Sequence, residues 1–360
     1  MSLRTSEMLR LGKLVTPVPD RDMPVYSWFL AKESFSRELV LTLADTWKLT
    51  SGDRVLDPFC GAGTTLLACR ELGIESIGFD VHPMMLFASR VKLSDYERAA
   101  LSDTADELLK SEYEEVHEDV PAFVKRVFSP ETLNDLLFFR KAVNLVEDAL
   151  IRDFMKMVLV NSAVRCSWMV KDGSAIRSVR RRTPQLRKAF AEQARKMICD
   201  TEKIKFSDAR ATVMRGDARL LPLEDGAISA VITSPPYLNK NEYLHAYRVE
   251  QWIAGLDQVS GEETLGGSGD GGAEAYFRNM RTVISEIRRV CRPGGRICVV
   301  VSDACSREGV VEVCIPLCRM AEEEGLKARR AIVVNKRQCT TPSRKKLGLT
   351  KEALLVWEKQ

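Results

Sequence analysis

An apolar run that stops at two consecutive prolines constrains this chain more than any other stretch. Residues 227–232 read Ala-Ile-Ser-Ala-Val-Ile, which is typical of a buried strand in a parallel sheet. The run leads directly into Thr233-Ser234-Pro235-Pro236-Tyr237. Because proline donates no hydrogen bond to a sheet ladder, we expect the strand to end there, with its last side chains facing the crevice beyond its carboxyl end.

The residues at this strand end suit the recognition of a flat base that carries an amino group. A serine hydroxyl and a proline carbonyl can accept the two N–H hydrogens, and a tyrosine ring can stack on the base. Ser234, Pro235, Pro236 and Tyr237 are therefore the candidate catalytic residues. A strand-ending turn with a chance tyrosine would explain the same letters, so the interpretation depends on the rest of the chain.

A second strand end carries a glycine-containing bend. The strand 54–58 ends in Asp57-Pro58, and Phe59-Cys60-Gly61-Ala62-Gly63-Thr64 then leads into a helix expected over 63–72. Glycines at this place let the backbone bend sharply and approach a ligand closely. The segment has neither the Gly-Lys-Ser/Thr of a phosphate loop nor the third glycine of a dinucleotide fingerprint, which argues against both of those sites.

Two further strands end next to acidic residues. Asp80 closes the strand 76–80, and Asp217 follows the strand 211–215. A carboxylate at such a position can accept the hydroxyl groups of a ribose, as in nucleoside-binding sheets. Together with Asp57, these residues place three carboxylates at strand ends, which predicts a nucleoside-like ligand in the crevice.

On these residues, the chain resembles the S-adenosylmethionine-dependent methyltransferases that modify N6 of adenine or N4 of cytosine in nucleic acids. The resemblance covers residues 36–92 and 210–360 and covers 95–205 poorly. It implies an α/β fold with a seven-stranded, doubly wound, Rossmann-like sheet whose last strand is antiparallel beside its predecessor. It also implies S-adenosylmethionine as the cofactor. The cofactor-binding residues that it implies are Asp57, Pro58, Phe59, Gly61, Gly63, Thr64, Asp80, Asp217 and Thr233.

The chain divides into three parts on this interpretation. We expect a leader over 1–35, a methyltransferase core over 36–94 and 206–360, and an inserted helical region over 95–205 that could serve target recognition. Apolar residues recur at helical spacing in the insert. In the leader, Lys32, Glu33 and Phe35 stand where the family often supports its cofactor, although a surface helix is an equal alternative. The remaining core elements are expected as helices at 83–92, 242–254, 273–291 and 310–324 and as strands at 227–233, 296–302, 327–335 and 352–358.

Positive charge gathers in one part of the insert. Residues 171–205 hold eleven bases and four acids. This segment could neutralise the phosphates of a nucleic acid, or it could form a solvated helix face. The candidate nucleic-acid contacts are Arg177, Arg180, Arg181, Arg182, Arg187 and Lys188.

Several other classes of function are disfavoured. Ten cysteines occur without a C-x-x-C pair and the three histidines lie far apart, so we expect reduced thiols and no metal site. No apolar run is long enough for a membrane span and no signal peptide is visible, which predicts a cytoplasmic protein. None of the fourteen prolines precedes a cysteine. That absence excludes the cysteine nucleophile that methylation at carbon five of cytosine requires.

The choice of substrate depends on the first residue of the catalytic motif. Serine at position 234 favours N4 of cytosine, because adenine-specific members of the family usually carry Asp or Asn there. DNA is the favoured nucleic acid. The alternatives are an RNA amino-methyltransferase acting on ribosomal or transfer RNA, an N6-adenine DNA methyltransferase and a non-catalytic nucleic-acid-binding module. The sequence leaves the recognition sequence and the oligomeric state open.

Overall fold

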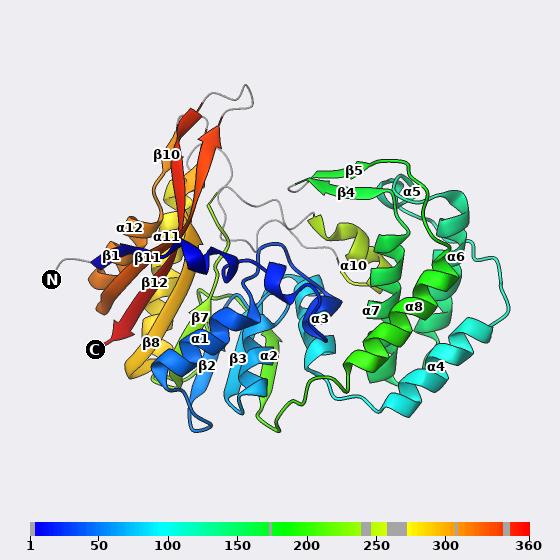
Figure 1. Ribbon diagram of the computed structural model, residues 1–360, viewed down its shortest axis with the longest axis horizontal. Helices are drawn as coiled ribbons and strands as arrows, with labels where there is room; N and C mark the ends of the chain where they lie inside the picture. The colour runs from blue at the N-terminus through cyan, green and yellow to red at the C-terminus, as the bar shows by residue number, and fades with distance from the viewer. Residues whose placement is uncertain (1–3, 173–174, 239–245, 258–271, 307–308, 341–345) are drawn as a thin grey trace.

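The computed structural model describes residues 4–172, 175–238, 246–257, 272–306, 309–340 and 346–360. At its centre lies a mixed sheet of eight strands in the order β1-β11-β12-β8-β7-β2-β3-β6 (Figure 1). In chain order these strands are β1 (Arg4–Glu7), β2 (Arg54–Asp57), β3 (Glu75–Asp80), β6 (Ala211–Arg215), β7 (Ile228–Thr233), β8 (Cys291–Ser302), β11 (Leu326–Thr340) and β12 (Lys346–Lys359).

The pairing directions match the predicted doubly wound sheet. Strands β6, β3, β2, β7 and β8 run parallel to one another, and β12 lies antiparallel between β8 and β11. The seven predicted strands and the antiparallel last strand are therefore confirmed. The eighth strand, β1, was not predicted; it comes from the expected leader and pairs in parallel with the outer edge of β11.

Helices cover both faces of the sheet, as the continuous apolar strands require. On one face α1 (Arg37–Trp47) and α2 (Thr64–Glu71) pack over Val55, and on the other α11 (Gly272–Val290) and α12 (Cys314–Glu323) share a cluster with Leu56. The side chains of Val55 and Leu56 thus point to opposite faces of the sheet, because successive strand side chains alternate between faces. The helix α3 (Pro83–Leu93) joins β3 to the insert.

Several predicted boundaries differ from the observed ones. The strand β8 begins five residues early because its pairing with β7 shifts register around 292–295. In place of the predicted helix 310–324 the structure has the two-residue strand β10 (Val310–Val311) and then the helix α12. The strand β10 pairs antiparallel with β9 (Ala304–Cys305). Of the predicted helix 242–254 the structure has α10 (Arg248–Ala254), while 242–245 lie outside the described residues.

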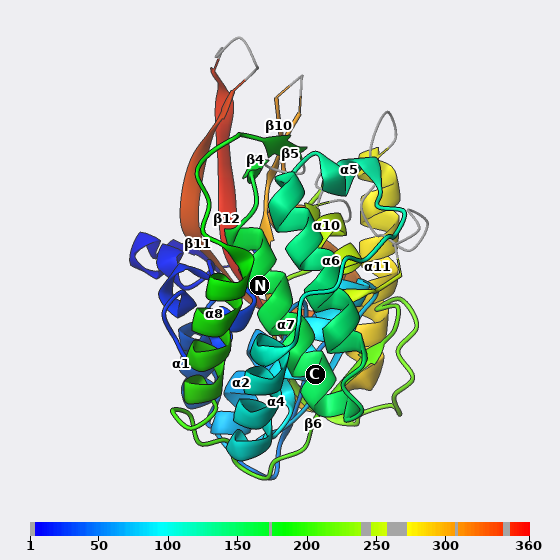
Figure 2. The same cartoon turned by 90° about the vertical axis from the view of Figure 1, so that its right-hand side faces the viewer.

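The insert forms a group of helices beside the sheet, here called the helical layer (Figures 1 and 2). Its elements are α4 (Arg98–Lys110), α5 (Ala122–Lys125), α6 (Pro130–Asn144), α7 (Ala149–Arg165), the hairpin β4 (Met169–Asp172) and β5 (Ala175–Ser178), and α8 (Leu186–Asp200). The hairpin was not predicted. Two of the helices start at side-chain caps, since Ser129 accepts a hydrogen bond from Thr132 N and Asp148 accepts two from the first turn of α7.

The described segment before the core contacts both the sheet and the helical layer. It contains the 3-10 helices η1 (Leu9–Lys13), η2 (Val18–Asp20) and η3 (Tyr26–Trp28). Trp28 is buried in the apolar cluster of the insert, and its Nε1 donates to the carboxylate of Asp200 at 3.2 Å. Residues of α10 belong to the same cluster. The helical layer therefore draws on residues on both sides of the 95–205 segment, and residues 4–35 of the expected leader are part of the folded body.

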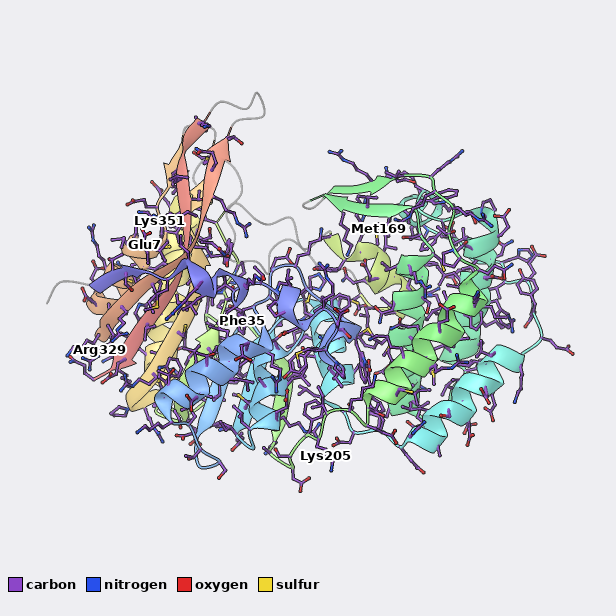
Figure 3. All side chains as sticks on the ribbon, viewed as in Figure 1. Glu7, Phe35, Met169, Lys205, Arg329 and Lys351 are labelled. Carbon is purple, nitrogen blue, oxygen red and sulfur yellow. A yellow bond between two sulfur atoms is a disulfide. The ribbon has the colours of Figure 1, made fainter. Side chains whose placement is uncertain are left out.

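The order of strands fixes where a ligand can bind. The strands β2 and β7 are neighbours, but the connection that leaves β2 leads to β3 on one side and the connection that leaves β7 leads to β8 on the other. Crevices in open α/β sheets form at such a switch point. In Figure 3, Phe35 lies between the sheet, which carries Lys351, and the insert, which carries Met169.

Candidate active site

A cavity of about 370 Å³ opens at this switch point. Its walls come from the carboxyl ends of β2, β3 and β7, from the segment 31–35 and from the middle of β12. Most of the residues that the sequence singles out meet here, although they come from four separate parts of the chain. Those that line the cavity are Asp57, Pro58, Phe59, Gly61, Thr64, Asp80, Asp217, Ser234, Pro235, Pro236 and Tyr237.

Asp57 joins the two central strands. Its carboxylate accepts hydrogen bonds of 2.6 Å from the hydroxyls of Thr65 and Thr233, and one of 3.2 Å from Phe59 N. Burial raises the pKa of Asp57 to about 6, because desolvation outweighs these hydrogen bonds. Since three donors already occupy the carboxylate, the observed role of Asp57 is to hold the glycine-containing bend against the end of β7.

The two glycines of the bend have different structural roles. Gly61 has φ +50°, and a Cβ at this position would meet no atom within 4 Å. Gly63 has φ +82°, but a Cβ there would lie 2.9 Å from Ser89 Oγ. Gly61 therefore leaves room on the cavity side, whereas Gly63 allows close packing against α3. Gly63 and Thr233 lie behind the cavity wall and are not among its described lining residues.

The other two acidic residues keep their carboxylates at the cavity. Asp80 accepts from Gly61 N at 2.9 Å and from His82 N at 2.8 Å, one bond on each oxygen, and burial raises its pKa. Each oxygen can accept a further hydrogen bond. Asp217 pairs with the guanidinium of Arg219, with the closest contact at 2.6 Å. Burial pushes the pKa of Asp217 up, but the hydrogen bonds and charge of Arg219 prevail and hold it below its ordinary value.

The residues of the predicted catalytic motif form a further part of the cavity wall. The hydroxyl of Ser234 donates to the carbonyl of Val300 in β8 at 3.3 Å, which directs the hydroxyl proton away and leaves the oxygen lone pairs as acceptors. The hydroxyl of Tyr237 donates to Glu352 Oε1 at 3.0 Å. Burial, followed by the negative charge of Glu352, raises the pKa of Tyr237 well above its usual range. The tyrosine is therefore a neutral hydrogen-bond donor with a fixed ring.

Sequence reasoning missed several residues of this site. Glu352 and Arg337 line the cavity from β12 and β11, and His82 lines it from the start of α3. Lys92 is buried behind the glycine bend and donates to the carbonyls of Phe29 and Ala62, at 2.6 and 3.2 Å. Burial lowers the pKa of Lys92 to about 7. A lysine inside an apolar helix pattern is a usable signal, but nothing local in the sequence shows its partners.

The segment before α1 also reaches the cavity. Residues 31–35 line it, including Lys32, Glu33 and Phe35, which the resemblance marked as a weak candidate segment. The hydroxyl of Tyr247 in turn donates to the Glu33 carboxylate at 3.2 Å and accepts from Lys32 N at 3.3 Å. The cavity is thus closed on one side by a segment that is anchored to the helical layer.

Comparison with known proteins decides the family. The chain matches the N6/N4 DNA methylase family over residues 34–88 and 228–360, which together make up more than half of its length. Both matched parts contain strand ends that line the cavity. The chain belongs to the N6/N4 DNA methylase family. The predicted family is therefore confirmed, and the reaction class is S-adenosylmethionine-dependent methylation of an amino group in DNA.

Individual relatives agree with this assignment. The chain is 25% identical to the Type II methyltransferase M.BsoBI of Geobacillus stearothermophilus, over 96% of this chain and 88% of that protein. It is 26% identical to the Type II methyltransferase M.AvaI of Nostoc, over 68% of this chain and 57% of that protein. A short match of 32% identity links 19% of the chain to 20% of the tRNA (guanine(10)-N2)-dimethyltransferase of Methanothermobacter thermautotrophicus.

Solved structures give a looser comparison. A SAM-dependent methyltransferase from Methanosarcina mazei aligns with 88% of this chain and 96% of its own at 9% identity, with a TM-score of 0.36. The assignment of the fold therefore comes from the strand order and pairing of this sheet.

The cavity fits the cofactor of this DNA methylase. Its volume lies within the range of about 300–1,000 Å³ that is usual for small-molecule sites. Gly61 leaves open space on the ligand side, and the carboxylate of Asp80 retains acceptor positions suited to ribose hydroxyls. In the described part of the chain, no group of three or more His, Cys, Asp or Glu side chains could hold a metal ion.

The candidate nucleic-acid contacts lie away from the cavity on the insert. Arg177, Arg180, Arg181, Arg182 and Lys188 are exposed. The hairpin and its continuation carry the four arginines. The guanidinium of Arg181 donates to the carbonyl of Ser167, and that of Arg180 stacks on Trp168. Arg187 is more enclosed than these, because its guanidinium donates to the carbonyls of Leu109 and Ser111 and stacks on the rings of Phe138 and Phe139. Its donors are used inside the insert, which makes it a packing residue in this structure.

Two further expectations concern the whole chain. Eight cysteines are free, as predicted, but Cys305 and Cys339 form a disulfide between β9 and β11, so the expectation of reduced thiols throughout is wrong. The sequence could not show this pair, because the two cysteines lie 34 residues apart and meet only through the sheet.

None of the helices among the described residues has the length and apolar character that crossing a bilayer demands.

Proposed function

We propose that this DNA methylase transfers the methyl group of S-adenosylmethionine to N4 of cytosine in duplex DNA. The observation that carries the proposal is the meeting of Gly61, Asp80 and the Ser234–Tyr237 motif around one cavity. A cofactor site and an amino-group site that share one enclosed space are what an in-line methyl transfer needs.

The cofactor half of the cavity is assigned to the ends of β2 and β3. Asp80 is proposed to accept the ribose hydroxyls and Asp217 to face the adenine, while Pro58, Phe59 and Thr64 line the space between them. Gly61 lets the backbone approach the ligand. S-adenosylmethionine, when bound, would supply an electrophilic methyl group on a positively charged sulfur. On transfer the carbon–sulfur bond would break, the sulfur would keep the electron pair as neutral S-adenosylhomocysteine, and the methylated nitrogen would lose one proton to water. The chain's own residues then orient the cofactor and exclude water.

The base half is assigned to the catalytic motif. The lone pair of an aromatic amine is delocalised into the ring and is a poor nucleophile. Acceptors at Ser234 Oγ and the Pro235 carbonyl would hydrogen-bond the two N–H groups, favour a pyramidal nitrogen and direct its lone pair at the methyl group. The proton of Ser234 is already engaged by Val300, so the hydroxyl is oriented as an acceptor.

Tyr237 is proposed to stack on the target base. Its hydroxyl is held by Glu352, so the ring is fixed before the base arrives. Such stacking is worth about 1–3 kcal/mol per base. Because the cavity is enclosed by strand ends and the 31–35 segment, the base must leave its duplex to reach it.

The preference for cytosine rests on Ser234. Adenine-specific relatives usually carry Asp or Asn at this place, but a hydroxyl and a carboxamide can both accept an N–H hydrogen. The shape of the pocket must therefore contribute to the choice. The most specific statement that the residues support is N4 of cytosine, with N6 of adenine as the alternative product.

The β4–β5 hairpin is proposed to contact the duplex. It projects on the same side of the molecule as the carboxyl end of β11 and the start of β12 (Figure 1). Val170 and Arg177 are paired across the hairpin and exposed, and Val179, Arg180 and Arg182 continue the exposed surface. A two-stranded ribbon fits the major groove, and the arginines can neutralise phosphates. Arg337 adds an exposed positive charge at the rim of the cavity.

The proposal is tested by transfer of a radioactive methyl group to nucleic acid. Purified protein and labelled cofactor are incubated in parallel with duplex DNA, single-stranded DNA and ribosomal RNA. We expect label in duplex DNA, and a loss of about 10²-fold in the turnover of Ser234→Ala, the scale of removing one preorganised partner. Calorimetry should show unchanged cofactor affinity in that variant. Label confined to RNA would overturn the DNA assignment, and equal turnover in the variant would place the chemistry elsewhere.

A further inference from the structure

Glu352 is a carboxylate at a position where the sheet otherwise holds apolar side chains. It lies in β12, a central strand, and is 8% exposed, followed by the buried run Ala353, Leu354 and Leu355. A buried carboxylate is costly unless hydrogen bonds satisfy it. Its presence in the wall of the active-site cavity therefore calls for a role beyond packing.

Two donors, from two different elements, reach this carboxylate. Tyr237 donates its hydroxyl to Oε1 at 3.0 Å, and Asn335, directly opposite in β11, donates Nδ2 to Oε2 at 2.7 Å. The same amide nitrogen of Asn335 lies 3.2 Å from the carbonyl of Gly12, in the N-terminal segment. Arg337 is further away, with Nη2 3.9 Å from Oε2, and its side chain is mostly exposed.

This network holds the side chain of Tyr237 at its hydroxyl group. A tyrosine ring turns about two side-chain torsions, and a hydrogen bond at the hydroxyl removes that freedom. Within the described residues, no other aromatic ring packs in a pair with Tyr237. Glu352 holds the hydroxyl of Tyr237 beside the contribution of Ser234, and the cross-strand pair with Asn335 holds Glu352 in turn.

We propose that Glu352 is a positioning residue, which orients Tyr237 so that its ring meets the flipped target base in the plane needed for methyl transfer. This inference rests on the proposed function, because it assigns a role relative to the target base. Arg337 and Asn335 complete the network from β11. Glu352 acts through Tyr237 and leaves the cofactor half of the cavity unchanged.

A double-mutant cycle tests the proposal. Glu352→Ala and Tyr237→Phe each remove the same hydrogen bond from opposite ends, and each should lower kcat/KM for DNA by about ten- to a hundredfold. If the two residues act as one unit, the double variant should be no worse than the poorer single variant. The dissociation constant for S-adenosylmethionine should stay within about twofold in all three. Glu358→Ala, on the same strand but outside the cavity lining, is the matched control and should keep parental kinetics.

Glu352→Gln separates positioning from charge. The amide oxygen can accept from Asn335 while the amide nitrogen donates to the Tyr237 hydroxyl, so both contacts can persist. We expect this variant to retain kcat/KM within about fivefold of the parent. Losses that multiply in the double variant, or a glutamine variant as poor as the alanine variant, would overturn the positioning role. Should Glu352→Ala fold poorly by thermal melting, the comparison is between Tyr237→Phe, which should lose activity, and Glu352→Gln, which should keep it. A glutamine variant as poor as Tyr237→Phe would then overturn the positioning role.

The outcome for Glu352 is separable from that for the proposed function. A parent protein that methylates duplex DNA, together with multiplying losses, removes only the role of Glu352. A parent that transfers no methyl group to DNA removes both.

Discussion

Replacing Gly61 with alanine should weaken cofactor binding as well as lower the stability of the fold. The residue has φ +50°, where a side chain costs about 1–2 kcal/mol, but the new Cβ would meet no atom of the protein within 4 Å. The methyl group would stand in the cavity, in space that the cofactor is proposed to fill. Overpacking of this kind costs about 1–3 kcal/mol, which corresponds to about a 5- to 150-fold rise in Kd.

Gly255→Ala provides the matched control. Gly255 follows α10 with φ +71°, and a Cβ there also meets nothing within 4 Å, but the residue does not line the cavity. Both variants should lose similar stability in urea unfolding, and calorimetric titration with S-adenosylmethionine should show weakened binding only for Gly61→Ala. Parental affinity in Gly61→Ala, or an equal loss in Gly255→Ala, would refute the placement of the cofactor beside Gly61.

Three further outcomes are expected. Thr233→Val removes one of the hydroxyls bonded to the buried Asp57 and should lower the free energy of unfolding by about 1–3 kcal/mol; an unchanged urea midpoint would contradict this. Lys92 has a pKa of about 7 in the folded chain and an ordinary value of 10.5, so the unfolded chain binds the extra proton between these values. Stability should therefore rise with pH in that window by up to about 1.4 kcal/mol per unit, and Lys92→Met should show a smaller rise between pH 7 and 9. Neutralising Arg180 and Arg182 should weaken DNA binding and reduce its salt slope by about 1 per lost phosphate contact, and an unchanged slope would favour a solvated surface.

The parts that could be predicted from sequence are those where local chemistry and long-range order agree. The strand ends at Asp57, Asp80 and Thr233 follow apolar runs and precede glycine or proline, so their position in a parallel sheet follows from the pattern. Parallel strand ends gather at one edge of a sheet, which is why residues far apart in sequence could be assigned to one cavity. The doubly wound sheet and its antiparallel last strand came from the family resemblance.

The parts that could not be predicted depend on contacts between distant segments. The four residues of β1 carry no apolar pattern and become a strand only because β11 offers a free edge. The hairpin β4–β5 has strands of four residues each, too short for periodicity to show. The bond between Tyr237 and Glu352 joins residues 115 positions apart. Arg187 resembled its basic neighbours in sequence, but the rings of α6 bind its guanidinium.

The nucleoside content of methylated DNA tests the central claim most directly. Duplex DNA that has reacted with the protein and S-adenosylmethionine is digested and analysed by mass spectrometry, with the Ser234→Ala variant as the control. The account predicts N4-methylcytosine in the parent reaction, little N6-methyladenine, and a strong reduction in the variant. Mainly N6-methyladenine would contradict the cytosine assignment, and the absence of any methylated base from duplex DNA would contradict the account of the site itself.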